Sequence, residues 1–224
     1  MIPFYKINPD NNSLIETNLI YTPYVNGNRL RMVFDHTSAY QTTDLQSWLP
    51  ERPYYTKDMV KFMFEREVKY ITAFKDYPWA PKNIVIDNQT QSVEFDFPGE
   101  TCNQIVYGNR SLDDECPDWQ AQMRIILKDI VSAGYYKTSL YPHCYYIDNG
   151  ILRTFDFYGC AECNDPYVPL DSIKGMIGET SGPRFVEATE GDKLNIEILF
   201  KQALLKYVEW PGDYLKTLYT ELYE

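Results

Sequence analysis

Hydrophobic and polar positions in the first part of the chain follow patterns typical of strands. Two such segments, Leu19–Val25 and Arg29–Phe34, flank Asn26-Gly27. Asn-Gly is a strong hairpin signal because both positions of the turn favour a positive φ. We expect the segment Phe4–Ile7 to pair ahead of this hairpin, through turn-rich residues 9–12.

A helical period replaces the strand pattern from about Thr56. Apolar residues then recur at steps of three and four, at Val60, Phe64, Val68 and Ile71. This spacing places them on one face of a helix, which the prolines at 78 and 81 end. A second helix is predicted from the cap Asp118 to Ser132, with Gly134 as its stop.

Two further hairpins are predicted, at residues 83–87 with 92–97 and at residues 145–147 with 151–155. The second turns through Asn149-Gly150. Two helices, at residues 194–208 and 212–223, close the chain. This order predicts an α+β fold: a strand-rich N-terminal lobe with one long helix (residues 1–101) and a mainly helical C-terminal lobe (residues 102–224), forming a single domain.

Composition and charge narrow the function classes. The 224 residues are 44% hydrophobic and 24% charged, the balance of a folded protein, and 16% are aromatic. The net charge of −11 disfavours nucleic acids and anionic membranes, which would be repelled at long range. No apolar run approaches the length of a membrane span. Nucleotides and proteins remain as candidate partners.

Cysteine usage and the N-terminus predict a cellular location. The five cysteines are an odd number scattered between residues 102 and 163, which fits a reduced, cytoplasmic protein better than a disulfide framework. The first residues show no pattern of a secretory signal. The tyrosine- and asparagine-rich composition would suit an A+T-rich genome, for instance a viral one, and then the location is the host cytoplasm.

Four joints between these elements carry a resemblance to a known family. They are the helix segment Phe64–Val68, the hairpin end Phe95–Thr101, the loop Gly134–Asp148 with its Leu-x-Pro, and the segment Leu152–Gly159 with its Asp-Phe. Their order and spacing resemble the protein-kinase-like superfamily, especially compact members such as aminoglycoside and choline kinases. The resemblance covers roughly Leu19 to Gly159 and implies a two-lobed kinase-like fold.

The resemblance also implies roles for individual residues. Glu67 takes the place of the helix glutamate that pairs with a strand lysine, and Arg31 is the basic residue on the corresponding strand. The strand and hinge that cradle adenine correspond to Glu94, Phe97 and Gly99. Asp156 corresponds to the metal-binding aspartate.

The catalytic loop departs from the family pattern. Aligned through Leu140 and Pro142, Ser139 replaces the catalytic aspartate and Cys144 replaces a metal-binding asparagine. A serine hydroxyl does not carry the negative charge that orients the acceptor hydroxyl, and a thiol is a poor ligand for magnesium. His143 lies in the same loop as a candidate base, although a solvent-facing histidine is the more common finding.

These departures favour a degenerate kinase, a pseudokinase that serves as a nucleotide-binding or regulatory module. An atypical ATP-dependent phosphotransferase acting on a small molecule or a protein is the alternative. ATP and magnesium are the candidate cofactors. A weaker alternative is a zinc or redox protein in which Cys160 and Cys163 form a C-x-x-C motif with Cys144 and His143 nearby, but a lone C-x-x-C makes zinc an unfavoured cofactor.

Overall fold

The structure, a computed structural model, describes residues 5–7, 14–16, 21–34, 57–137, 140, 142–157, 160–162, 167–169 and 185–187. The two helices expected near the C-terminus lie outside these residues. In the described part the fold mixes helices with strands, and every strand pair is antiparallel.

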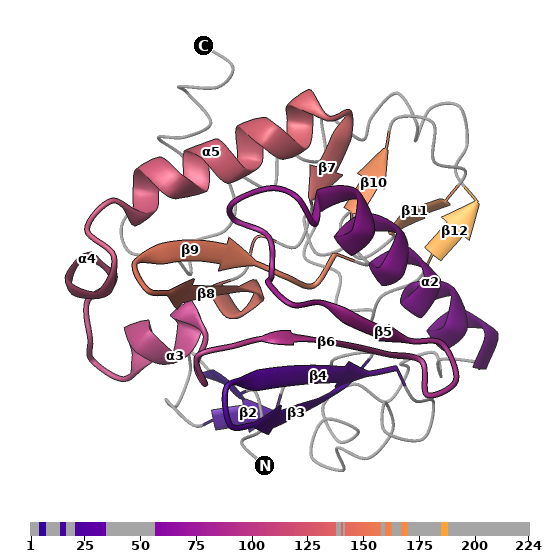
Figure 1. The fold of residues 1–224 in the computed structure, drawn as a ribbon, viewed down its shortest axis with the longest axis horizontal. Helices are drawn as coiled ribbons and strands as arrows, with labels where there is room; N and C mark the ends of the chain where they lie inside the picture. The colour runs from indigo at the N-terminus through magenta and orange to yellow at the C-terminus, as the bar shows by residue number, and fades with distance from the viewer. Residues whose placement is uncertain are drawn as a thin grey trace.

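A four-stranded antiparallel sheet forms one side of the molecule (Figure 1). Its order is β3-β4-β6-β5, from β3 (Thr22–Asn26), β4 (Arg29–Val33), β5 (Val85–Asp87) and β6 (Ser92–Asp96). Both hairpins predicted for this region are therefore confirmed. The inner face of the sheet carries apolar side chains that alternate with polar ones along β4, so Leu30 and Met32 are buried while Arg29 and Arg31 lie on the other face.

The two Asn-Gly turns differ in detail. In the β3–β4 hairpin Asn26 pairs with Arg29, so the turn is Gly27-Asn28, and Gly27 alone of these two has a positive φ, +58°. In the later hairpin Asn149 and Gly150 are the turn residues, with φ of +52° and +77°, as a type I′ turn requires. The N-terminal strand β1 (Tyr5–Ile7) pairs with β2 (Leu14–Glu16), which the sequence did not predict as a strand.

The helix α2 (Lys57–Phe74) lies across the sheet and carries the predicted apolar face (Figure 1). Phe64 contacts Phe34 at the end of β4, with 5.7 Å between ring centroids. At its C-terminal end Phe74 contacts Tyr135 of the second half and Phe157, at 5.3 and 5.5 Å. The helix therefore packs against the sheet and the second half at once.

The second half begins with two short helices, α3 (Cys102–Tyr107) and α4 (Leu112–Glu115), and the long helix α5 (Trp119–Ser132). The strands that follow are β7 (Tyr135–Lys137), β8 (Tyr145–Asp148), β9 (Ile151–Thr154), β10 (Cys160–Glu162), β11 (Tyr167–Pro169) and β12 (Phe185–Glu187). A 3₁₀ turn, η2 (Pro142–Cys144), precedes β8. The β8–β9 hairpin lies between α5 and the sheet (Figure 1).

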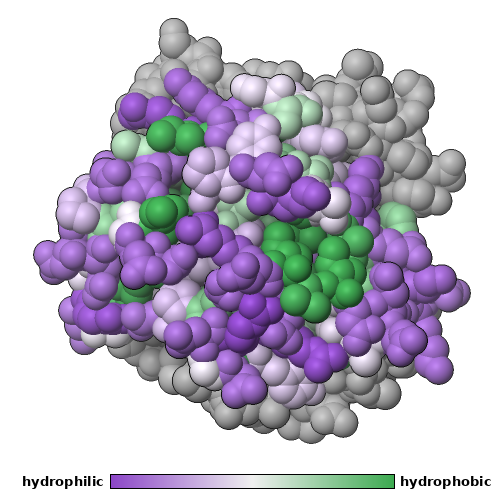
Figure 2. Space-filling model, viewed as in Figure 1, coloured by the Kyte–Doolittle hydropathy of each residue, from purple (hydrophilic) through white to green (hydrophobic). Residues whose placement is uncertain are grey.

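Aromatic rings fill the space between the sheet and the β8–β9 hairpin. Phe95 and Phe97 from the β6 region contact Tyr146 and Phe155, with centroid distances of 5.3 to 6.4 Å. On the outside, Figure 2 shows a hydrophobic patch in the region of β5, which carries Val85 with 56% of its surface exposed. Among the helices of the described residues, none combines the length and hydropathy needed to cross a bilayer.

Candidate functional site

Side chains from α2 and from three segments of the second half meet around residues 156 and 157. Helix α2 contributes Glu67, β7 contributes Lys137, η2 contributes His143 and Cys144, and the segment after β9 contributes Asp156. Glu67, Lys137 and Cys144 are fully buried, and Asp156 is 2% exposed. A group of ionisable and metal-ligating side chains this deep in the protein is a candidate functional site.

Glu67 holds the segment after β9 against α2. Its Oε2 accepts a hydrogen bond from the backbone N–H of Phe157 at 2.5 Å. The expected pair with Arg31 does not form, because Arg31 lies on the outer face of β4. There Arg31 donates to Ser92 at 3.1 Å and to Thr90 at 2.9 Å. The glutamate thus contacts backbone where the resemblance implies a basic side chain.

Lys137 fixes the same segment from the other side. Its Nζ donates to the carbonyl oxygens of Phe155 and Asp156, at 2.9 and 2.7 Å. The ammonium also lies 5.1 Å from the ring centroid of Phe157 and 5.9 Å from that of Tyr145, where cation–π attraction adds to the hydrogen bonds. A buried lysine is stable only with such partners.

Asp156 has an unusual backbone and a thiol partner. Its φ is +66°, in the left-handed region that non-glycine residues seldom adopt. Its Oδ2 accepts a hydrogen bond from the Cys144 thiol at 3.3 Å, while its buried Oδ1 has no hydrogen-bond partner among the described residues. Strained backbone of this kind clusters at functional sites.

Burial governs the protonation of this pair. It raises the pKa of the Asp156 carboxyl, against the opposing effects of Lys137 and of the Cys144 hydrogen bond. Burial, together with the neighbouring Asp156 charge, also raises the pKa of the Cys144 thiol well above its ordinary value. Cys144 is therefore a neutral thiol at neutral pH, and it donates its proton to Asp156 Oδ2.

His143 completes a group of three metal-ligating side chains. Ligand atoms of His143, Cys144 and Asp156 all lie within 4.8 Å of one another. Cys144 and Asp156 are buried and His143 is half-buried. The cysteine and the aspartate that the resemblance pairs as metal-site positions thus lie side by side in the fold.

Phe97 and Gly99, the residues expected at an adenine-binding hinge, lie just after β6 in the chain. Phe97 is buried among aromatic rings, and its N–H donates to Asn28 O at 2.8 Å. The preceding carbonyl, Asp96 O, accepts a hydrogen bond from the Tyr146 hydroxyl at 3.0 Å. Gly99 has a φ of +108°, and a Cβ there would meet nothing within 4 Å. The backbone edge expected to cradle adenine is thus partly engaged by protein groups.

Glu94 lies on the outer face of the sheet, opposite the buried Phe95. It accepts a hydrogen bond from Arg29 Nε at 2.7 Å. Glu94 and Arg31 line a groove of about 650 Å³ on that face, together with Tyr24, Val25, Asn26, Arg29, Val33 and Thr90. The structure therefore separates these two candidates from Asp156 by the thickness of the sheet.

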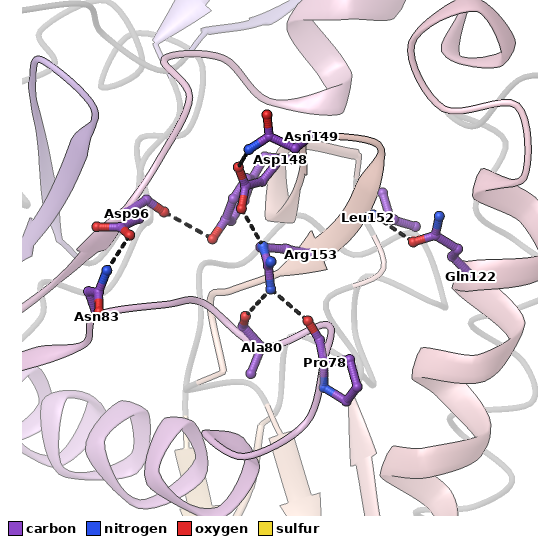
Figure 3. Close-up of polar contacts among 10 residues, drawn as sticks. Pro78, Ala80, Asn83, Asp96, Gln122, Asp148, Asn149, Leu152 and Arg153 are labelled. Atoms are coloured by element: carbon purple, nitrogen blue, oxygen red, sulfur yellow. Dashed lines mark hydrogen bonds and ion pairs between the residues drawn. The ribbon is translucent and has the colours of Figure 1, made fainter.

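Arg153 of β9 links the second half to the segment after α2 (Figure 3). The arginine is 1% exposed, and its NH1 donates to Pro78 O at 2.6 Å and to Ala80 O at 2.7 Å. Its Nε donates to Asp148 Oδ2 at 2.9 Å. Sequence reasoning missed both Arg153 and Lys137. Most of their partners are backbone carbonyls, which leave no signal in the sequence.

The cysteine motif does not form the expected site in the described part of the chain. Cys160 is fully buried in β10, where burial raises the pKa of its thiol to about 12. Among the described residues, the only group with metal-ligand spacing contains Cys144 and not Cys160. Cys163 and the candidate catalytic residue Ser139 both lie outside the described residues.

Comparisons with known proteins give little beyond this geometry. No protein-family model matches the chain, and a search of curated proteins gives no match. Among solved structures, a crystal structure of monomeric WbdD is similar with a TM-score of 0.43 and 12% sequence identity. The match covers 90% of this chain and 44% of the WbdD chain, so this chain spans less than half of that protein's length. No family or activity follows from a similarity at this level.

Proposed function

We propose that this chain is a degenerate kinase-like protein that acts as a regulatory or interaction module and not as a catalyst. The observation that carries the proposal is the contact between Cys144 and Asp156. Magnesium prefers hard oxygen ligands, and here the carboxylate expected to hold it accepts a hydrogen bond from a buried thiol. Phosphoryl transfer depends on such bound cations to stabilise charge.

The hinge supports the same proposal. The carbonyl of Asp96 and the N–H of Phe97 are already hydrogen-bonded to Tyr146 and Asn28. An adenine ring would have to displace these bonds and separate the aromatic rings around them. We therefore expect nucleotide binding to be weak and independent of metal.

Thermal unfolding with and without ATP, each in magnesium, manganese or EDTA, tests the proposal. A ligand at about 100 times its dissociation constant adds about 2.7 kcal/mol of stability. For a chain of this size, that corresponds to a rise of roughly 5–10 °C in Tm. We expect no metal-dependent rise of this kind, and a clear one that requires magnesium would contradict the proposal.

An atypical phosphotransferase is the second candidate, and one observation favours it. Asp156 is held in place by Lys137, and its buried Oδ1 has no hydrogen-bond partner among the described residues. If this oxygen binds a catalytic cation, transfer of labelled phosphate from ATP should be detectable and should disappear in Asp156→Ala. Asp114→Ala, at an exposed position of α4, is the matched control and should retain the activity.

A further inference from the structure

We propose that His143, Cys144 and Asp156 form a site for a thiophilic divalent cation of the zinc type. The inference does not rest on the proposed function, since such an ion could serve an inactive protein as well as an active one. It concerns a different ion from the magnesium of a kinase and adds a histidine to the ligands. The set of one imidazole, one thiolate and one carboxylate is typical of zinc.

The geometry of Cys144 and Asp156 fits this ion. Zinc bonds to thiolate sulfur at about 2.3 Å and to carboxylate oxygen at about 2.0 Å, so two such ligands on a tetrahedral ion lie about 3.5 Å apart. The Cys144 Sγ and Asp156 Oδ2 atoms are 3.3 Å apart. These two ligands therefore stand nearly at the required separation.

His143 supplies the third ligand. Its ligand atom lies within 4.8 Å of the other two, so a shift of about 1 Å brings it to the ligand spacing of a tetrahedral ion. The residue is half-buried, so this side of the group is not closed off from solvent. Three protein ligands leave a fourth position for water or another small ligand.

A second observation points to a ligand at the same place. Asp156 is 2% exposed, and its Oδ1 is buried with no hydrogen-bond partner among the described residues. Such an acceptor is unusual in a folded protein and is explained by an ion or a water molecule. The strained φ of +66° and the hydrogen bond from Lys137 to the Asp156 carbonyl fix this carboxylate in position.

Binding exchanges one proton for one metal ion. The Cys144 thiol, which now donates to Asp156, loses its proton to solvent, and the sulfur bonds to the cation. No oxidant or reductant is required. The ion would connect η2 to the segment after β9, so the site would stabilise the same region that Lys137 and Glu67 hold.

The test uses the full chain, stripped with a chelator and titrated with Co²⁺ as a spectroscopic probe and with Zn²⁺ in competition. We expect one equivalent of Co²⁺ to produce a thiolate-to-cobalt charge-transfer band, which one equivalent of Zn²⁺ removes and millimolar magnesium does not. Cys144→Ser should abolish the band. His143→Ala should weaken Co²⁺ binding at least roughly tenfold, because even outer-shell changes cost about 10–100-fold in metal affinity.

Two control variants separate this site from other thiols. Cys102→Ser removes a buried cysteine outside the group, and Cys163→Ser removes half of the C-x-x-C motif. Both should keep the band at full intensity. Far-UV circular dichroism of each variant establishes that it is folded, and the half-buried His143 provides a test if Cys144→Ser does not fold.

Three results would overturn the inference. They are the absence of the charge-transfer band in the wild-type chain, its persistence in Cys144→Ser, and its loss in Cys163→Ser with His143→Ala unaffected. The last result would assign the metal to the C-x-x-C motif. None of these depends on ATP, so the outcome is independent of the nucleotide experiment.

Discussion

Asp156 combines two features that usually destabilise a protein, a buried carboxyl group and a left-handed backbone conformation. Neither is offset fully by the Cys144 thiol, which reaches only one of the two carboxylate oxygens. Residues of this kind are retained for function more often than for stability. Replacing Asp156 is thus a way to measure whether this residue costs the protein stability.

Asp156→Asn is expected to be as stable as the wild type or more stable at neutral pH in EDTA. Asparagine tolerates the positive φ, can still accept from Cys144 and carries no charge to bury. Each kcal/mol gained would raise the Tm by about 2–4 °C for a chain of this size. Asp156→Ala should be less stable than Asp156→Asn, because alanine adopts the left-handed region at a cost of about 1 kcal/mol.

The pH dependence has a defined sign. Burial raises the pKa of Asp156 above its ordinary value of 3.8, so the folded state holds this proton more tightly than the unfolded state. The stability that this group contributes is therefore lost as the pH rises from 3.8 through the higher pKa of the folded state. The advantage of Asp156→Asn should grow from pH 4 upward and then level off, as measured by thermal unfolding. An advantage that is largest in acid would contradict this account.

At the scale of single residues the sequence predicted part of the site. The resemblance gave Cys144 and Asp156 the places of two metal ligands, a role that stays a prediction, and the structure places the two side chains in contact. The pairing of Arg31 with Glu67 was wrong, because the strand alternation that turns Leu30 inward turns Arg31 outward. Lys137 could not be assigned from pattern alone, since its partners are backbone carbonyls that carry no sequence signal.

At the scale of elements, one buried side chain contributes several of the polar contacts between the two halves. Arg153 of β9 donates to the carbonyls of Pro78 and Ala80, while Asp148 of β8 holds its Nε (Figure 3). Three neighbouring segments are therefore joined by a single planar group. Only a guanidinium offers this fork of donors.

Arg153→Met is expected to lower the free energy of unfolding by about 3 kcal/mol, because it leaves buried carbonyls and the Asp148 carboxylate without their partner. Arg153→Lys keeps the charge without the fork of donors, so its free energy of unfolding should lie between those of the wild type and Arg153→Met. Urea denaturation measures both. Arg110→Met is the control, since it removes an exposed arginine paired with Glu100 and Glu115 and should cost no more than about 1 kcal/mol. Equal losses of unfolding free energy in Arg153→Met and Arg110→Met would mean that the buried hydrogen bonds of Arg153 stabilise the protein no more than a surface ion pair does.

Some helices and strands could be predicted from local sequence patterns, and others could not. The hairpin turns and the long helices α2 and α5 were predicted within a few residues, because Asn-Gly pairs and helical periods are local patterns. The short helices α3 and α4 were missed, since six and four residues are too few to show a period. The pairing of β1 with β2 was missed because partner choice between short strands depends on the whole fold.

At the scale of the whole molecule, charge opposes folding. The chain carries a net charge of −11 and has an isoelectric point near 4.7. Like charges repel more strongly in the compact state than in the unfolded chain. Salt shortens the range of this repulsion from about 30 Å at 0.01 M to about 10 Å at 0.1 M.

We therefore expect the Tm at pH 7.5 to rise as sodium chloride is increased between these two concentrations, as measured by differential scanning fluorimetry. The same titration at pH 5.5, closer to the isoelectric point, is the control and should give a smaller rise. A fall in Tm at pH 7.5 would show that surface pairs such as Arg29 with Glu94 outweigh the net repulsion.

The buried ammonium of Lys137 has a consequence for chemical reactivity. An amine that is enclosed and hydrogen-bonded to two carbonyls is shielded from acylating reagents, whereas exposed amines such as those of Lys61 and Lys128 are open to them. Those carbonyls belong to Phe155 and Asp156, so any movement of the segment that carries Asp156 uncovers the amine. The rate at which Lys137 is acylated therefore reports how often the site opens. Mass spectrometry measures this rate without a substrate or a known partner.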